Sequence, residues 1–383
     1  MSPNSPASPV SPKAKPQQAP DLLYSEAEED LRSALRSLLT DRCDPASVIA
    51  ATESTTPHDA ELWKALATDM GLAGLLVPED LGGQGATHRE AAVVVEELGR
   101  AVAPVPYLTS AVVATDVLLG CDTTNAQVAE LIGALASGRT IGVLALPLST
   151  APGASYDGIR ADGDTVSGRI TAVADAAVAD VLLVVADGRL HAVDTAQDGV
   201  TVTPQSALDL TRPLATVTLA AAHARVLADS ADAPVRRGLL SGAALLAAEQ
   251  LGVADWCLTE TVRYVRDRKQ FNRPVGSFQA LKHRLAELWL EVVNARAAAR
   301  NAADALATAN PEAPLAAALA QAYCAPMAVH AAEEALQLHA GIGMTWEHPV
   351  HLYLKRAKAD SIALGTAGRH RDAVAELVDL RAP

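Results

Sequence analysis

The chain has 383 residues, 50% of them hydrophobic, and its 31 basic and 45 acidic side chains give a formal charge of −14. This acidic balance argues against nucleic acid and against an anionic membrane surface as partners. The 2 Phe, 6 Tyr and 4 Trp residues also leave few rings on which bases could stack. No run has the length and hydrophobicity of a membrane span and no signal peptide is visible, so we expect a cytoplasmic protein.

The first part of the sequence predicts helices behind a flexible tail. Residues 1–20 are rich in Pro and Ser and are predicted to be disordered. Ser25 and Glu28 form a capping-box pattern, so order should begin near Tyr24. Apolar residues at helical spacing then predict helices over residues 59–70, 88–102, 107–119 and 125–137. We therefore expect an N-terminal helical domain over residues 21–138.

The pattern changes twice further along the chain. Over residues 139–228, short β-branched runs between Gly, Asp and Pro turns predict a compact β domain, with strands near residues 141–146, 181–185, 200–203 and 215–219. Over residues 229–383, alanine-rich helical periods predict a helical domain, with helices over residues 238–264, 276–309, 314–341, 348–358 and 368–380. The fold class is therefore mixed and mainly α, in the order α, β, α.

The cysteines and histidines indicate no metal site. The four cysteines (Cys43, Cys121, Cys257 and Cys324) are far apart and form no C-x-x-C pair. The ten histidines form neither H-x-x-x-H nor H-E-x-x-H. We therefore predict reduced thiols and no bound metal.

Two motifs in the C-terminal third resemble signatures of the acyl-CoA dehydrogenase family. Residues 268–283, RKQFNRPVGSFQALKH, resemble the family's R-x-Q-F-G-x-P-I-x-x-F-Q-x-x-K motif, with Asn272 at the glycine position. Residues 337–349, QLHAGIGMTWEHP, resemble its Q-x-x-G-G-x-G block, with Ala340 at the first glycine. The segments GLAGLLVPEDLGGQG and REAAVVVEELGR resemble the family's N-terminal helical region. The resemblance covers roughly residues 24–381.

The resemblance implies a fold and a reaction. The expected fold is an N-terminal helical domain, a middle β-barrel or sandwich domain and a C-terminal four-helix bundle. Such proteins bind FAD and an acyl-CoA thioester: a carboxylate takes the α proton, the β hydride leaves for flavin N5, and an electron-transferring flavoprotein reoxidises the flavin. Burial tunes the pKa of such a base, and hydrogen bonds to the thioester carbonyl stabilise the developing enolate. The resemblance also implies an oligomer, a dimer of dimers.

Several residues match cofactor-binding positions of the family. Arg268 matches the arginine that meets the FAD pyrophosphate from the neighbouring subunit, a role that suits a guanidinium fork. The other matching positions are Gln270, Phe271, Phe278, Gln279, Gln337, Gly341 and Thr366. Glycine at position 341 would allow close backbone approach, although a helix cap explains it equally well.

The catalytic carboxylate is missing from both positions where the family carries it. Leu364, before Gly365-Thr366, stands at the commoner position, and the second position, on the helix before Arg268, falls near Gly242. Glu249 lies seven residues further along that helix, two turns away on nearly the same face, and is our candidate base. An acid in so apolar a stretch is either functional or ion-paired. Asp360 is a weaker candidate.

The middle region departs further from the family. The family's A-L-T-E-P-x-A-G-S-D stretch is replaced by ALPLSTAPGAS, and Tyr156 is the only aromatic residue between Leu108 and Asp255. The segments from Ala179 and from Leu208 (LDLTR) still resemble strands of divergent, actinobacterial-type members. Three functions therefore remain open: an FAD-dependent acyl-CoA dehydrogenase, a non-catalytic partner subunit of an α2β2 dehydrogenase, and an acyl-CoA oxidase or flavin monooxygenase on the same scaffold.

Overall fold

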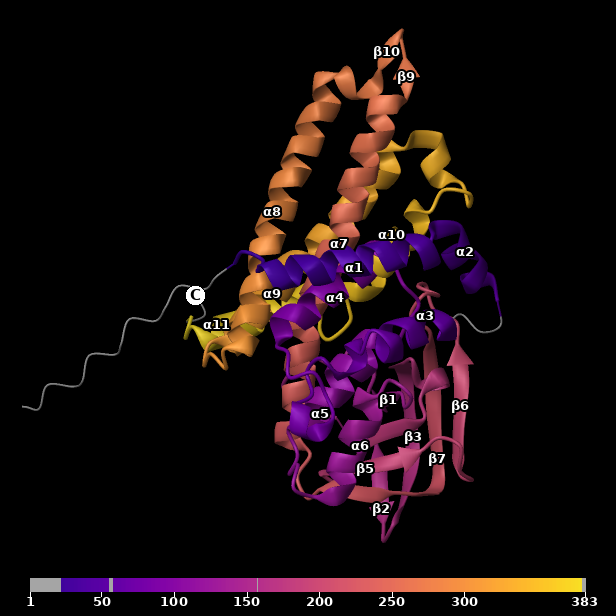
Figure 1. Cartoon of the computed structure of the whole chain (residues 1–383), viewed down its shortest axis with the longest axis vertical. Coiled ribbons are helices and arrows are strands. Elements are labelled where there is room, and N and C mark those ends of the chain that lie inside the picture. The colour runs from indigo at the N-terminus through magenta and orange to yellow at the C-terminus, as the bar shows by residue number, and fades with distance from the viewer. Residues whose placement is uncertain (1–21, 55–57, 157, 381–383) are drawn as a thin grey trace, which may run out of the picture.

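The computed structural model describes residues 22–54, 58–156 and 158–380 (Figure 1). The predicted tail over residues 1–20 lies outside these described ranges. Helices occupy the N-terminal part of the chain, two β-sheets follow, and long helices form the C-terminal part. The predicted fold class is confirmed. The division into domains at residues 138/139 and 228/229 stays a prediction.

The N-terminal part is built from short helices, several of them with tightened or widened turns. Its α-helices are α1 (Glu26–Arg42), α2 (Pro45–Glu53), α3 (Ala60–Lys64), α4 (His88–Ala101), α5 (Thr115–Leu119) and α6 (Ala126–Ala136). The other helical segments are η1 (Ala65–Asp69) and η4 (Tyr107–Ala114), both π-helical, and η2 (Leu72–Gly74) and η3 (Glu79–Leu81), both 3₁₀. Helix α2 has no counterpart among the predicted helices.

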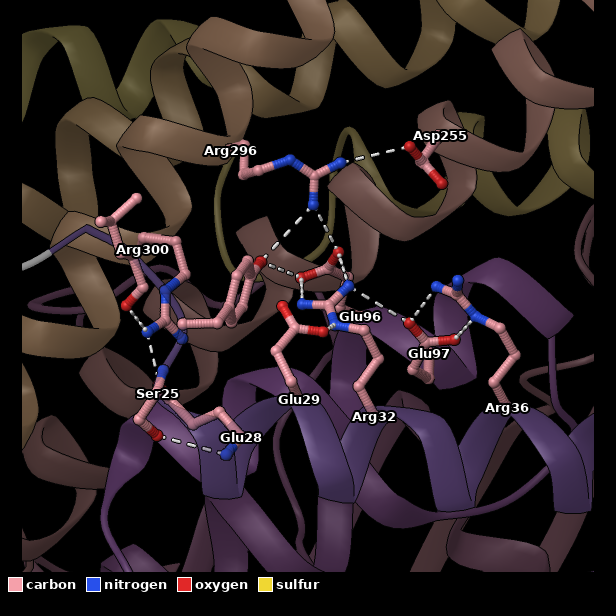
Figure 2. Close-up of polar contacts among 12 residues, drawn as sticks. Ser25, Glu28, Glu29, Arg32, Arg36, Glu96, Glu97, Asp255, Arg296 and Arg300 are labelled. Atoms are coloured by element: carbon pink, nitrogen blue, oxygen red, sulfur yellow. Dashed lines mark hydrogen bonds and ion pairs between the residues drawn. The ribbon is translucent and has the colours of Figure 1, made fainter.

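Helix α1 begins at the predicted capping box and is held by buried ion pairs. The Ser25 side chain accepts from the backbone N–H of Glu28, whose carboxylate accepts from the backbone N–H of Ser25. Arg32 reaches Glu96 on α4 at 2.9 Å, and Arg300 on α8 (Gln279–Ala307) reaches Glu28 at 2.8 Å (Figure 2). These pairs attach α1 to two other helices across the junction between the N- and C-terminal helices.

The middle part folds into two four-stranded sheets. One has the strand order β1 (Gly142–Leu144), β4 (Val181–Ala186), β5 (Arg189–Asp194), β8 (Arg225–Ala228). The other has the order β2 (Ile159–Asp162), β3 (Thr165–Ala174), β7 (Leu214–His223), β6 (Val200–Gln205). Strands β1 and β4 pair in parallel, with Val143 opposite Leu182, and the remaining pairs within the two sheets are antiparallel.

One predicted strand is wrong. The segment that begins at Leu208 was expected to resemble a strand, but it lies in the connection between β6 and β7. Asp209, Thr211 and Arg212 of this connection are buried. Their side chains point to partners in the C-terminal helices, as the ion pairs described below show, so the segment serves as a contact between the sheets and the bundle.

The C-terminal part consists of long helices that pack closely. They are α7 (Asp232–Asp267), α8 (Gln279–Ala307), α9 (Ala313–Leu338), α10 (Val350–Asp360) and α11 (Ala367–Leu377), with 3₁₀ segments η6 (Val275–Ser277) and η7 (Ala340–Met344). Helix α7 packs against α4, α8 and α9. It crosses α4 at Gly252, where an added Cβ would lie 1.9 Å from the backbone oxygen of Glu96, so only glycine allows this approach.

Helix α9 is the one described helix that is long and apolar enough to cross a membrane by length and composition. It packs against α7, α8, α10 and α11, and much of its surface is buried among them. Its composition is therefore explained by its place inside the helical bundle.

Candidate functional site

The Arg268 motif folds as the tip of the longest projection of the molecule. Helices α7 and α8 extend away from the sheets and are joined by a hairpin of β9 (Lys269–Gln270) and β10 (Arg273–Pro274) (Figure 1). Phe271 and Asn272 form its turn, with φ of 51° and 65°. Asn tolerates this left-handed backbone well, whereas Phe is strained there. The turn therefore holds Phe271 out in solvent, 86% exposed.

The tip carries cationic and aromatic side chains on an open surface. Arg268 and Gln270 are exposed, and Gln279 opens α8 beside them. The rings of Phe271 and Phe278 meet edge to face at 6.1 Å, and the guanidinium of Arg273 lies 3.9 Å from the centre of the Phe278 ring. Such a surface suits a ligand that is both anionic and flat.

The Gln337 block begins in the last turn of α9 and continues beyond it, near the tip. Gln337 and Gly341 are exposed, and His339 between them packs against Tyr264 of α7, with ring centres 4.5 Å apart. Within 4 Å of an added Cβ at Gly341 there is no described atom of this chain, so nothing in the described fold requires glycine there. Ala340 adopts φ 54°, a conformation that glycine would adopt without strain.

Thr366 lies apart from the other predicted cofactor residues. Its hydroxyl accepts a hydrogen bond from the backbone N–H of Arg369 and so caps α11. Helix α11 lies at the other end of the bundle from the tip (Figure 1). The structure therefore brings Arg268, Gln270, Phe271, Phe278 and Gln279 together on the tip and places Thr366 beside Leu364. The residues predicted to bind the cofactor therefore lie in two separate places on the chain.

Leu364 and Gly242, the two positions that the sequence comparison aligned with the family's base, come together in space. A Cβ added at Gly242 would lie 3.0 Å from Leu364 Cδ1 and 2.7 Å from Val113 Cγ2. Leu364 is buried and has φ 53°; its N–H donates to Leu148 O at 2.7 Å. Its carbonyl accepts from the His370 ring at 3.0 Å. The backbone of this loop is therefore held firmly, while the side chains at both positions carry no acid.

The space beside Leu364 is small and apolar. A cavity of about 40 Å³ lies there, lined by Val113, Leu239 and Leu364 among others, with the Thr109 hydroxyl as a polar group. A larger cavity of about 460 Å³ lies between the loop at Ala151 and the helices α7, α9 and α11, with Arg236 and Arg369 among its lining residues.

Glu249 is held between two arginines. Arg212 donates to both of its carboxylate oxygens at 2.8 and 2.7 Å, and Arg356 of α10 donates to Oε1 at 2.6 Å. Glu249 is 2% exposed. Burial alone would raise the pKa of this carboxyl, but the charges and hydrogen bonds of Arg212 and Arg356 lower it below its ordinary value. In this environment the carboxylate stays ionised, and both of its oxygens accept hydrogen bonds from arginines.

Two further acids complete this buried cluster. Asp209 accepts from Arg356 Nε at 2.5 Å, and Asp360 accepts from Arg212 Nη1 at 2.9 Å. Burial, followed by the charge of Glu249, raises the pKa of Asp360 well above its ordinary value. Its second oxygen has no hydrogen-bond partner within the described chain. A proton on Asp360 leaves two negative charges facing two arginines, so the charges balance.

The middle sheets carry a cavity whose residues were not predicted as site residues. It measures about 260 Å³ and is lined by Tyr156, Arg169 and Thr171 among others. The isolation of Tyr156 in a stretch poor in aromatic residues was the one sequence signal for it. Arg169 and Thr171 lie on β3, and their position at the cavity depends on how the segment at residues 145–156 folds over that strand.

Comparisons with known proteins agree with this architecture. The family described as "Acyl-CoA dehydrogenase, N-terminal domain" matches residues 25–139, and the one described as "Acyl-CoA dehydrogenase, C-terminal domain" matches residues 232–378. The chain belongs to the acyl-CoA dehydrogenase family, a family of flavoprotein oxidoreductases of lipid metabolism.

Among its relatives is the acyl-CoA dehydrogenase IpdE2 of Mycolicibacterium smegmatis, 39% identical over 342 residues, which cover 89% of this chain and 95% of the relative. Two solved structures resemble this chain, each at 29% sequence identity. The ChsE4-ChsE5 complex from Mycobacterium tuberculosis has a TM-score of 0.83, covering 95% of this chain and 100% of that one. A steroid ACAD described as a Tcur3481-Tcur3483 variant has a TM-score of 0.81, covering 92% and 98%.

Proposed function

We propose that this chain is one subunit of a heteromeric acyl-CoA dehydrogenase in which the catalytic base comes from a different, homologous chain. The observation that carries the proposal is the meeting of Leu364 with Gly242, since neither position supplies a carboxylate. Both structural relatives at 29% identity are named by two components, which supports a two-chain enzyme here as well.

Glu249 stays a prediction as base, but its environment opposes that role. A general base must have an oxygen free to reach the substrate proton, and a pKa near the operating pH serves it best. Both oxygens of Glu249 are bound by arginines, and the pKa is lowered. The same contacts explain the acid fully as part of a structural cluster. We therefore favour the partner-subunit function over a self-sufficient dehydrogenase.

The described residues fit FAD, which acts as hydride acceptor in this family. Arg268 and Gln270 on the exposed tip offer hydrogen bonds to a pyrophosphate carried by a neighbouring chain, with Phe271 and Phe278 beside it. Gln337 and Gly341 would face the same cofactor. The cavity at Tyr156, Arg169 and Thr171 offers a second, polar and aromatic surface for the flavin half of a site on this chain.

The remaining parts of the proposal follow from the family. The substrate is an acyl-CoA thioester, which the 460 Å³ cavity near Ala151 can accept, with Arg236 and Arg369 able to meet its phosphates. An electron-transferring flavoprotein takes the electrons, and the assembly is a cytoplasmic α2β2 tetramer.

Purifying the chain by itself and together with a partner chain tests this function. The chain is expressed by itself and together with a homologous chain that has Glu at the position of Leu364 or Gly242. We expect a stable complex of both chains by light scattering and FAD bound in that complex, with little FAD on the single chain. A single chain that forms a homotetramer holding one FAD per subunit contradicts the proposal.

A further inference from the structure

Three side chains beside the Gln337 block are brought together by the fold from distant segments. They are Glu260 on α7, His339 at the end of α9, and His348 in the segment before α10. One potential ligand atom of each lies within 4.8 Å of those of the other two. We propose that these three residues form a site for a divalent transition-metal ion, with Zn²⁺ as the favoured occupant.

The strongest support is the orientation of His339. The side chain is fully buried, and its Nδ1 lies 2.7 Å from the carbonyl of Ala335, to which it donates. This bond fixes the tautomer and leaves the lone pair on Nε2. In the described part of the chain Nε2 has no hydrogen-bond partner. A histidine that donates through one nitrogen to a backbone carbonyl and offers the other is the usual state of a metal ligand.

The ligand set fits zinc. Zn²⁺ binds neutral imidazole nitrogen and carboxylate oxygen, with a fourth position open to water. His339 is buried and His348 is half-buried. Tetrahedral zinc places ligand atoms about 3.3 Å apart, so atoms that lie within 4.8 Å of one another need to close by about 1.5 Å at most. Glu260 and His348 are partly exposed, which gives an ion a route of entry.

Two existing contacts compete with the ion. Arg263 binds both oxygens of Glu260, and its side chain is 66% exposed, so it can turn into solvent. Val350 N–H donates to Nδ1 of His348 at 3.3 Å, which is a long hydrogen bond. Metal binding removes it in either case, because Nδ1 then either binds the metal or carries the ring proton. Arg263 is therefore the main electrostatic opponent of the site, and this opposition gives the proposal a distinctive test.

The experiment is a Zn²⁺ titration of the full-length chain, stripped with a chelator, against a chromophoric zinc indicator. We expect Glu260→Gln and His348→Ala each to weaken binding at least tenfold. Arg263→Ala should strengthen it severalfold, a change that a purely structural cluster would not produce. His330→Ala is the matched control, because His330 also pairs with acids, Glu291 and Glu334, but lies outside the site.

Bound Co²⁺ gives a second readout, since its visible absorption reports the ligands directly. We expect a tetrahedral Co²⁺ spectrum in the wild-type chain that His348→Ala abolishes and His330→Ala leaves intact. Equal Zn²⁺ affinity of the wild type, Glu260→Gln and His348→Ala overturns the site. The site is also overturned if Arg263→Ala leaves the Zn²⁺ affinity unchanged and the wild-type chain shows no tetrahedral Co²⁺ spectrum.

Discussion

Among single residues, Glu249 has contacts that favour a structural role over a catalytic one. It neutralises Arg212 and Arg356 in a place that water does not reach. Removing one member of such a buried group leaves its partners charged and uncompensated, which costs more than the pair contributes in total. The stability of the junction between sheets and bundle therefore depends on this acid.

Replacing Glu249 by Gln should lower the free energy of unfolding by about 3 kcal/mol. The loss lies at the low end of the usual range because Asp360, freed from the negative charge beside it, can release its proton and take over part of the neutralisation. Urea unfolding at neutral pH measures the loss. The matched control is Glu333→Gln, which removes an exposed ion pair to Lys358 and should cost about 1 kcal/mol or less.

The same variant separates structure from catalysis. In a flavin-containing complex with the partner chain, Glu249→Gln should leave acyl-CoA-dependent flavin reduction within a fewfold of wild type, measured at a temperature where both are folded. Loss of reduction with FAD still bound would instead establish Glu249 as the base.

The site could be predicted from the sequence only in part. The apolar neighbours of Glu249 indicated that the acid is paired or functional, and the first alternative is the one that the contacts support. Its partners could not be named, because Arg212 and Arg356 lie 37 and 107 residues away. Likewise Glu260, His339 and His348 form no motif, since the fold alone brings them together.

At the scale of elements, the anchoring of α1 depends on ionised carboxyls. Burial alone would raise the pKa of Glu28, but hydrogen bonds from Arg89, Ser25 and Arg300 outweigh it and lower the pKa from 4.5 to about 2. A carboxyl with a lowered pKa stabilises the folded chain above its ordinary pKa. That contribution is lost as the pH falls from about 4.5 toward 2.

Glu28→Gln should therefore destabilise the chain by about 2 kcal/mol at pH 7, the scale of a charged hydrogen bond, and by progressively less below pH 4.5. Denaturant midpoints of the variant and the wild type, measured at a series of pH values, give the difference in their stability. Glu29→Gln, on the exposed face of the same turn, is the control and should show little effect. A difference that stays constant down to pH 3 would contradict this electrostatic account.

Arg268 on the tip is predicted to bind the cofactor. Arg268→Ala should weaken FAD binding by the assembled enzyme about tenfold to a hundredfold, the value of a charge-assisted hydrogen bond to phosphate. The fold should be unaffected, because the side chain is exposed. Arg266→Ala removes an equally exposed positive charge two residues earlier and should retain full FAD content. Equal flavin content in both variants would remove Arg268 from the cofactor site.

Helices were predicted well where the helical spacing of apolar residues repeats over many turns. The five C-terminal helices and α4 lie close to their predicted ranges, because apolar residues at helical spacing persist over several turns. Helix α2 is nine residues long and has one buried residue, Val48, so it offers no such period. Strands β2, β3, β5 and β8 were not singled out either, since turns and bulges interrupt their alternation.

Across the chain as a whole, the placement of exposed and acidic residues supports the proposed two-chain enzyme. The tip residues face outward, and α8 exposes Trp289, Leu290 and Val293, large apolar side chains that a neighbouring subunit would cover. The position of the base, by contrast, is filled with aliphatic carbon at Leu364. In the proposed enzyme, one chain therefore offers cofactor contacts to a neighbour, while the position proposed for its own base carries no acid.

Anaerobic flavin reduction tests this central claim most directly. The chain alone, supplied with free FAD, and its FAD-containing complex with the partner chain are each mixed with an acyl-CoA substrate, and the bleaching of the flavin absorbance is followed by stopped-flow. We expect rapid bleaching in the complex and none with the chain alone. Bleaching of the single chain at the rate of the complex would show that it carries its own base and would contradict the account.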